Sequence, residues 1–189
     1  TGTVKQTLEE GIYMYGDNVI QDILQIKRLK EKLAETCKET YYLFITGFNT
    51  GLKLQELLTL TKKDLMELKK TGAKEIVEPN FWQEIETYME KFADRDFIFP
   101  EQNDEATRNE GKMCRVLRDT AKDMGIDNFG NETLSKTHGY FHYQKFRDIE
   151  KLRKRFGLVS PTATLHYIGY RDDKYLCFHC NIGCIWNKM

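Results

Sequence analysis

The segment Thr40–Phe48 constrains the fold of this 189-residue chain most strongly, because it is apolar on nearly every side of a helix. Such a helix has no face suited to water, so we expect it to be buried. Gly51 follows it and is expected to end the turn after the helix. The rest of the chain then has to supply the layers that surround this helix.

Helical periodicity recurs along most of the remaining chain, with apolar residues returning every three to four positions. Asp17 or Asn18 is the expected N-cap of the first helix, because their side chains accept hydrogen bonds from free amides. The further predicted helices span 19–33, 54–62, 81–92, 111–124, 134–144, 149–156 and 162–170.

Two short segments depart from the helical pattern. Leu65–Lys70 and Lys74–Glu78 flank Gly72, which suits a tight turn, so they predict an antiparallel β-hairpin. Residues 97–100 predict a buried extended segment. The expected fold class is therefore mainly α with a small antiparallel β-hairpin or sheet. We expect an N-terminal extension over 1–16, one domain over 17–174 and a Cys-rich C-terminal tail over 175–189.

Three of the five cysteines lie in the C-terminal tail. The tail has residue types that bind zinc, but their spacing is irregular and too tight for a usual two-knuckle site. These candidate ligands are Cys177, His179, Cys180 and Cys184. We expect packing thiols there, and no metal or other cofactor. An odd cysteine count does not fit a secreted disulfide framework, so a reducing cytosol is the expected location.

The net charge of zero and the pI near 6.8 argue weakly against nucleic-acid binding, because phosphate neutralisation dominates such affinity. The distribution of charge is more informative. Basic residues cluster at 112–118 and 151–155, whereas acidic residues crowd 75–110. A polarised surface can still present a basic face to DNA, although each cluster alone is more typical of a solvated helix face. No apolar run approaches the roughly 20 residues of a membrane helix, so no membrane partner is expected.

Several sequence boxes resemble those of the tyrosine recombinase (phage integrase) family. Residues 43–60 are similar to the first box, with Thr50-Gly51-Leu52 in the turn and Asp64 a few residues later. Thr133–Tyr140 looks like the second box of integrases from low-GC Gram-positive bacteria. The segment ending in Thr164–Gly169 follows in register and contains Tyr167. The resemblance covers 17–173 and implies the catalytic-domain fold of this family, in a bacterial cytoplasm.

The resemblance implies phosphoryl transfer, in which a tyrosine attacks a DNA phosphate. Two arginines clamp the nonbridging oxygens, a lysine or histidine protonates the leaving oxygen, and another histidine orients the phosphate. Tyr167 and Lys70 match the family by identity. The remaining family positions are changed: Lys53 stands at the first arginine, Glu132 and Ser135 at the histidine and second arginine of the second box, and Leu158 at the later histidine.

These changes predict poor strand cleavage. Lysine keeps a charge but lacks the two-pronged donor of arginine. Glu132 is expected to repel a phosphate. Losing one oxyanion donor costs about 10²–10³ in rate, so the combined losses remove most of the acceleration. We expect no efficient recombination by the usual mechanism.

DNA binding does not need this chemistry, and the expected partner is double-stranded DNA. In the family, the helix that matches 111–124 lies in or near the major groove. The predicted DNA-binding residues are Lys62, Arg108, Lys112, Arg115, Arg118 and Lys136. Salt bridges to the acidic stretch are the alternative role for each of them.

Three functions are therefore open. The first is a DNA-binding protein of a mobile element (a phage, plasmid or integrative element) with little or no cleavage. The second is an atypical strand-transfer or nicking enzyme that uses Tyr167 with Lys53 and Lys70. The third is a protein-interaction domain without a DNA role. In the family the C-terminal segment often docks in a neighbouring subunit, so the tail is a candidate for homo-oligomer contacts.

Overall fold

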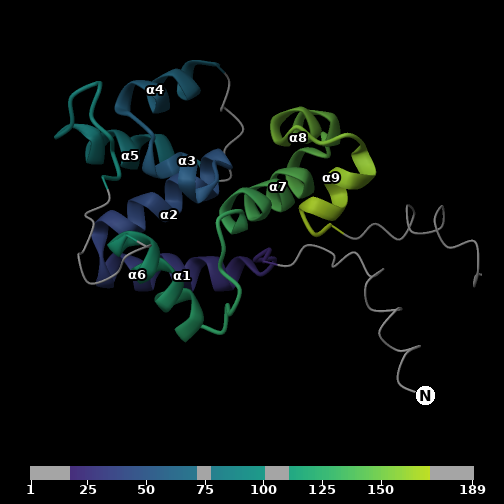
Figure 1. The fold of residues 1–189 in the computed structure, drawn as a ribbon, viewed down its shortest axis with the longest axis horizontal. Helices are drawn as coiled ribbons and strands as arrows, with labels where there is room; N and C mark the ends of the chain where they lie inside the picture. Colours follow the sequence, from purple (N-terminus) through teal and green to yellow (C-terminus); the bar gives the residue numbers. More distant parts are fainter. Residues whose placement is uncertain (1–17, 72–77, 101–110, 171–189) are drawn as a thin grey trace, which may run out of the picture. The chain divides into compact units, whose positions relative to one another are not determined.

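The computed structural model describes residues 18–71, 78–100 and 111–170, and these residues are mainly helical (Figure 1). Contacts divide the chain into two units. One is Asn18–Asp148, which we call the main unit, and the described part of the other is 149–170, which we call the C-terminal unit. The helices are α1 Ile23–Thr36, α2 Lys38–Thr50, α3 Leu54–Leu58, α4 Lys62–Thr71, α5 Phe81–Met89, α6 Lys112–Asp123, α7 Thr133–Phe146, α8 Ile149–Phe156 and α9 Pro161–Tyr167.

Helix α2 is the centre of the main unit, and its predicted burial is confirmed. Ten of its 13 residues are buried, and helices α1, α3, α5, α6 and α7 all pack against it. Three of its buried polar side chains bond to the helix itself: Thr46 Oγ1, Asn49 Nδ2 and Thr50 Oγ1 each donate to the carbonyl oxygen four residues earlier. This bonding removes the penalty of burying polar atoms in the core. Gly51 ends α2 in the left-handed region, with φ 70°.

Gly47 allows the close approach of α7 to α2. A Cβ atom at this position would lie 2.5 Å from Leu134 Cδ1 and 2.8 Å from Leu57 Cδ1. Both distances are shorter than packed carbon atoms tolerate. The glycine therefore lets the start of α7 and the helix α3 meet on one side of α2, which is where the candidate site is built.

The start of α1 differs from the prediction. Its N-cap is Asp22, whose Oδ1 accepts from Leu24 N at 2.8 Å, whereas Asn18 lies four residues earlier and Asp17 is outside the described residues. The buried Ile20 donates its backbone N–H to Thr137 Oγ1 at 3.1 Å. This bond to α7 satisfies the Ile20 amide outside a helix, and α1 begins after Asp22.

The predicted hairpin is wrong over its first strand, because Leu65–Lys70 lies within helix α4. Thr61 and Asp64 start this helix. Thr61 Oγ1 accepts from Asp64 N, and Asp64 Oδ2 accepts from Thr61 N, each at 3.2 Å. These reciprocal bonds form a capping box, and Leu65 then enters the core. Gly72 and the second predicted strand up to 77 lie outside the described residues.

Extended pairing within the described ranges is limited to one antiparallel bridge, between Thr61 and Phe97. Ile98 N donates to Leu60 O at 3.0 Å, and Ile98 and Phe99 are fully buried. The predicted buried extended segment at 97–100 is thus buried only at Ile98 and Phe99, whereas Phe97 and Pro100 are exposed.

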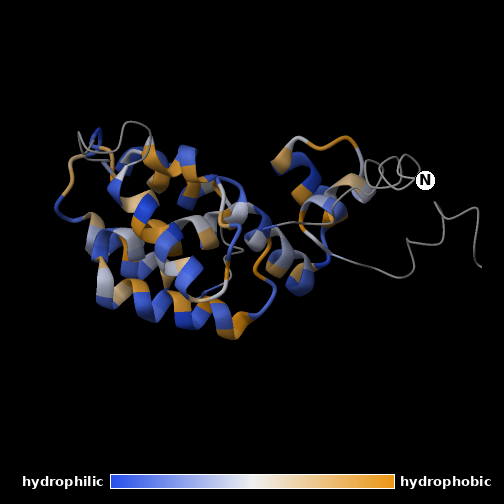
Figure 2. Cartoon of the chain, turned by 60° about the horizontal axis from the view of Figure 1, so that its bottom comes forward, coloured by the Kyte–Doolittle hydropathy of each residue, from blue (hydrophilic) through white to orange (hydrophobic). Residues whose placement is uncertain are grey.

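The amphipathic helices of the main unit carry apolar residues toward the core and charged residues outward, an alternation visible in Figure 2. Helix α6 buries Met113, Leu117 and Ala121, and Val116 is half-buried. No helix within 18–71, 78–100 or 111–170 is long and apolar enough to cross a membrane.

The C-terminal unit is built from α8 and α9, which pack together. Ser160 caps α9 by accepting from Ala163 N at 3.1 Å, and Pro161 occupies the first turn. Leu152, Leu165 and Ile168 are buried. The predicted bounds 149–156 of α8 are confirmed. The extension over 1–16 and the tail over 175–189, with its candidate zinc ligands, lie outside the described residues.

Candidate functional site

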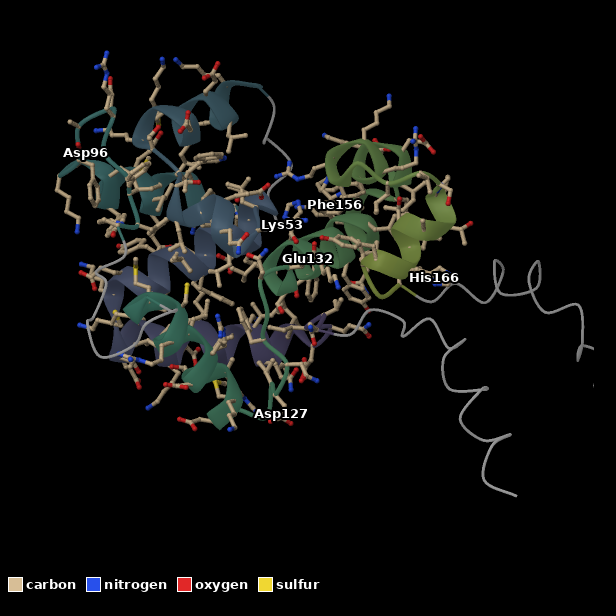
Figure 3. The ribbon with its side chains drawn as sticks, viewed as in Figure 1. Lys53, Asp96, Asp127, Glu132, Phe156 and His166 are labelled. Carbon is tan, nitrogen blue, oxygen red and sulfur yellow. The ribbon has the colours of Figure 1, made fainter. Side chains whose placement is uncertain are left out.

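The site begins at an ion pair between Lys53 and Glu132, two residues that the resemblance assigns to changed family positions. Lys53 Nζ lies 2.7 Å from Glu132 Oε1, although the two residues are 79 positions apart in the chain (Figure 3). Lys53 immediately precedes α3 and Glu132 immediately precedes α7. Both side chains are partly exposed, at 40% and 37%. The ion pair therefore joins the starts of two helices at the surface of the main unit.

Backbone hydrogen bonds hold the two helix starts together. Asn131 receives both of them: its carbonyl oxygen accepts from Leu54 N, and its Oδ1 accepts from Gln55 N, each at 2.9 Å. The amide of Lys53 donates to Glu56 Oε2 at 2.7 Å. Asn131 precedes Glu132 directly, so these bonds set the approach of the two charged side chains. Asn131 was not among the predicted site residues. The signal for it in the sequence was an Asn beside a helix start.

A second lysine lies on the other side of the Glu132 carboxylate. Lys136 Nζ is 3.6 Å from Glu132 Oε2, and its side chain is only 18% exposed. The hydrogen bond from Lys53, followed by the charges of Lys53 and Lys136, holds the pKa of Glu132 below its usual value, against the effect of burial. Glu132 is therefore ionised at neutral pH, and one carboxylate is shared between two ammonium groups.

The remaining second-box position offers no cation. Ser135 is buried, and its Oγ donates to Glu132 O at 2.9 Å within the first turn of α7. His138 is also buried, and its Nδ1 lies 2.9 Å from Phe48 O. Both side chains thus interact with backbone oxygens, which is a packing role rather than a phosphate-binding one.

Lys70 and Lys62, both in α4, differ in environment. Lys70 is exposed in the last turn, whereas Lys62 Nζ donates to Phe92 O at 2.9 Å. Lys69, next to Lys70, pairs with Glu86. Lys70 therefore stands on a helix and not at the end of the predicted first strand.

Helix α6 carries cations on one side of its exposed surface. Arg115, Arg118 and Lys122 recur at intervals of three and four residues, which places them on one stripe. Lys112 and Arg118 are exposed and Arg115 is half-buried. Arg108 lies outside the described residues. This stripe is a candidate surface for DNA phosphates.

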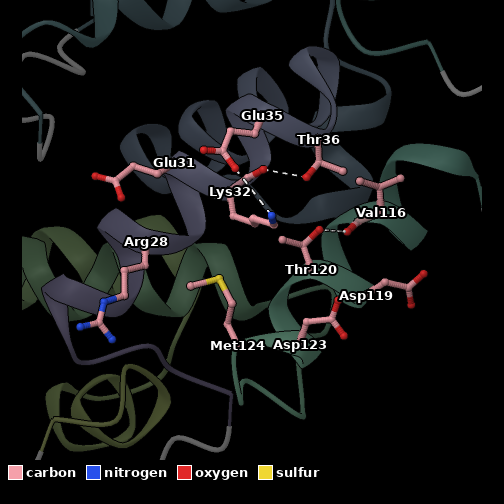
Figure 4. Close-up of a pocket in the computed structure, with 10 residues that line it drawn as sticks. All are labelled: Arg28, Glu31, Lys32, Glu35, Thr36, Val116, Asp119, Thr120, Asp123 and Met124. Atoms are coloured by element: carbon pink, nitrogen blue, oxygen red, sulfur yellow. Dashed lines mark hydrogen bonds and ion pairs between the residues drawn. The ribbon is translucent and has the colours of Figure 1, made fainter.

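A groove of about 650 Å³ runs between α1 and α6 (Figure 4). Its lining includes four carboxylates and two cations: Glu31, Glu35, Asp119, Asp123, Arg28 and Lys32. The lining hydroxyls of Thr36 and Thr120 donate to carbonyls of their own helices. The excess of negative charge makes this groove unsuited to a phosphate.

Tyr167 ends α9 in the C-terminal unit. Its side chain is partly buried, and its ring centroid lies 5.1 Å from that of Phe156 in α8. Leu158 lies in the connection between these helices, and its carbonyl oxygen accepts from the Arg153 guanidinium at 3.3 Å. An apolar side chain at 158 cannot donate a hydrogen bond to a phosphate.

Two comparisons with known proteins find relatives, while no protein-family model matches the chain. The chain is 29% identical over 163 residues to the "Probable integrase/recombinase YoeC" of Bacillus subtilis (strain 168), covering 82% of this chain and 90% of that protein. Its fold matches a crystal structure of XerA recombinase with a TM-score of 0.55 and 20% sequence identity. This match covers 86% of our chain but only 62% of the XerA chain.

The helical architecture and the arrangement of the boxes define a recombinase-fold protein. With the curated relative, they support the resemblance of the chain to the tyrosine recombinase family. The residues at its changed positions set it apart from the pattern of that family.

Proposed function

We propose that this chain is a DNA-binding protein of a mobile element that holds duplex DNA on the recombinase fold and cleaves it weakly or not at all. The observation that carries the proposal is the ion pair between Lys53 and Glu132. It joins two changed positions of the family's phosphate-binding set to each other. The relative in Bacillus subtilis is named as a probable integrase/recombinase, which favours a role on DNA.

Strand cleavage by this fold depends on donors that stabilise charge in the transition state. Lys53 directs its ammonium group at a carboxylate, Ser135 donates to a backbone oxygen, and Leu158 has no donor. Each missing oxyanion donor costs about 10²–10³ in rate. A phenol with a pKa near 10 attacks a phosphodiester slowly without such help. These losses support binding without efficient cleavage.

DNA binding is supported by the cations of α6. Lys112, Arg115 and Arg118 lie on a helix whose opposite face is packed in the core, so their positions are held by the fold. Contacts of this kind with phosphates position a protein on DNA without reading its sequence. Lys62 Nζ donates to Phe92 O, and Lys136 Nζ lies beside the Glu132 carboxylate, so both cations also interact within the main unit.

A paired experiment on the full chain tests the proposal. Fluorescence anisotropy with a labelled duplex is measured at increasing salt, and a pool of nicked duplexes of randomised sequence is used to trap a covalent adduct. We expect an affinity that falls steeply with salt, because bound phosphates release counterions. We expect no adduct at Tyr167.

Two outcomes contradict the proposal. An affinity that is absent at low salt removes the DNA role and leaves a protein-interaction domain. Rapid formation of an adduct that Tyr167→Phe abolishes identifies a nicking or strand-transfer enzyme instead.

A further inference from the structure

The carboxylate of Glu132 lies where two lysines converge. Its Oε1 is 2.7 Å from Lys53 Nζ, and its Oε2 is 3.6 Å from Lys136 Nζ. The two lysines come from different parts of the main unit, one from the start of α3 and one from the second turn of α7. The N-terminal end of α7, a helix of 14 residues, adds its positive dipole at the same place.

This arrangement differs from an ordinary surface ion pair. Lys69 and Glu86 show the ordinary case in the same unit, with one lysine, one glutamate and 37% exposure on each side. At Glu132 two cations face one carboxylate, and the Lys136 side chain is largely covered, which is unusual for a lysine. Two ammonium groups held close together repel each other unless an anion lies between them.

Backbone contacts fix the points from which the two lysine side chains extend. Asn131 binds the first two amides of α3, so the start of α3 stays beside the start of α7 whatever the charge at 132. Lys136 is anchored one turn into α7. Removal of the Glu132 charge would therefore leave two cations in place and without their shared counterion.

We propose that Lys53 and Lys136 form an anion site that Glu132 occupies from within the chain, and that a phosphodiester reaches these lysines only by displacing the Glu132 carboxylate. Glu132 is then a positioning residue that keeps a backbone phosphate off this surface. The inference rests on the proposed DNA binding for its physiological ligand, while the anion site itself can be tested without DNA.

The first test measures DNA affinity of the full chain carrying Glu132→Gln. Glutamine keeps the size of the side chain and removes its charge, so no carboxylate at 132 competes with a phosphate for the two lysines. We expect the affinity for a generic duplex to rise roughly tenfold, about the effect of one charge-assisted hydrogen bond. The slope of the logarithm of the binding constant against the logarithm of the salt concentration should become steeper by about 1, the value for one additional phosphate contact.

Glu86→Gln is the matched control. It removes the same charge from a glutamate that also pairs with a lysine, Lys69, in the same unit. Long-range attraction of DNA by the altered net charge contributes to both variants. The local site is reported only by the amount by which the affinity gain of Glu132→Gln exceeds that of Glu86→Gln. The double variant Lys53→Gln/Glu132→Gln should lose this additional gain.

The second test uses inorganic phosphate as the probe and lysine side-chain NMR as the readout. In Glu132→Gln, the Lys53 and Lys136 ammonium signals should shift saturably with phosphate, and in the unaltered chain they should stay constant over the same range. Circular dichroism verifies that each variant is folded.

The outcomes separate the two proposals. Equal DNA affinities of Glu132→Gln and Glu86→Gln, or an absence of phosphate-dependent shifts in Glu132→Gln, overturn the internal-anion inference and leave DNA binding intact. Saturable phosphate shifts in a chain that does not bind duplex at low salt support the anion site and reject the proposed function.

Discussion

Glu132 Oε1 lies 2.7 Å from Lys53 Nζ, so a carboxylate at one changed family position is neutralised by a lysine at another. Considered alone, Glu132 is expected to repel a phosphate, and Lys53 is expected to attract one. Paired, they largely cancel each other's field at a distance, because opposite charges in contact act as a dipole. The two substitutions are therefore best understood as one feature of the site.

The pKa of Glu132 tests this pairing directly. The carboxylate should titrate below its ordinary value of 4.5, because the ionised form accepts a hydrogen bond from Lys53. Replacing Lys53 by Met should raise the pKa of Glu132 toward that value. Carbon-detected NMR of the side-chain carboxyl gives the measurement.

Asp64 is the internal control for this titration. Its pKa is held below the ordinary value by hydrogen bonds from Thr61, so it should not move in Lys53→Met. The lowered pKa of Glu132 also fixes the sign of its effect on stability. Its contribution is present above the unfolded-state pKa and is lost as the pH falls through the folded-state pKa. In Lys53→Met, the stability lost as the pH falls should be smaller. An unchanged pKa of Glu132 in that variant would argue against the ion pair.

Thr61→Ala should lower the free energy of unfolding by about 1 kcal/mol, the usual effect of removing a threonine N-cap. Thr61 Oγ1 accepts from Asp64 N at 3.2 Å and starts helix α4. Urea denaturation measures the loss, and Lys63→Ala, at an exposed position of the same turn, is the control. A β-hairpin over 65–78 would instead be nearly insensitive to this cap, so equal stabilities of the two variants would contradict helix α4.

Gly47→Ala should destabilise the main unit by about 1–3 kcal/mol, because overpacking forces side chains or helices to shift. The new Cβ would lie 2.5 Å from Leu134 Cδ1 and 3.2 Å from Leu134 Cβ. Gly130→Ala is the matched control, since a Cβ there meets nothing closer than 3.7 Å. Thermal unfolding of both variants makes the comparison, and a Gly47→Ala protein as stable as Gly130→Ala would show that α7 does not approach α2 this closely.

Neutralising the α6 stripe should weaken DNA binding. The triple variant Arg115→Gln/Arg118→Gln/Lys122→Gln removes three cations from one side of the helix. The slope of log binding constant against log salt concentration should become shallower by about 2–3, since each phosphate contact contributes about 0.9. Salt titration by anisotropy provides the measurement.

The control for that variant removes three cations from α1. Lys27, Arg28 and Lys32 are exposed, and the last two line the groove that carries Glu31 and Glu35. Their replacement by Gln changes the net charge equally but away from the stripe. If both triple variants lower the slope by the same amount, α6 has no special place in DNA binding.

Local patterns were sufficient for much of the fold. The apolar segment Thr40–Phe48 predicted a buried helix, and Gly51 predicted its end, because both depend on residues close in the chain. Helix α8 has the predicted bounds for the same reason. Helix α4 was missed although its signal was also local: the Thr61–Asp64 capping box was present in the sequence, and Gly72 was given more weight as a turn.

The sequence by itself determined the mainly helical class of the fold and the buried centre of the main unit, and it predicted which family positions are changed. Only the tertiary structure decided what those positions do. Lys53 and Glu132 are 79 residues apart, and their contact depends on Gly47 and Asn131, which bring α7 and α3 together. Electrostatic effects depend on distance in space, so the role of Glu132 followed from its neighbours and not from its own charge.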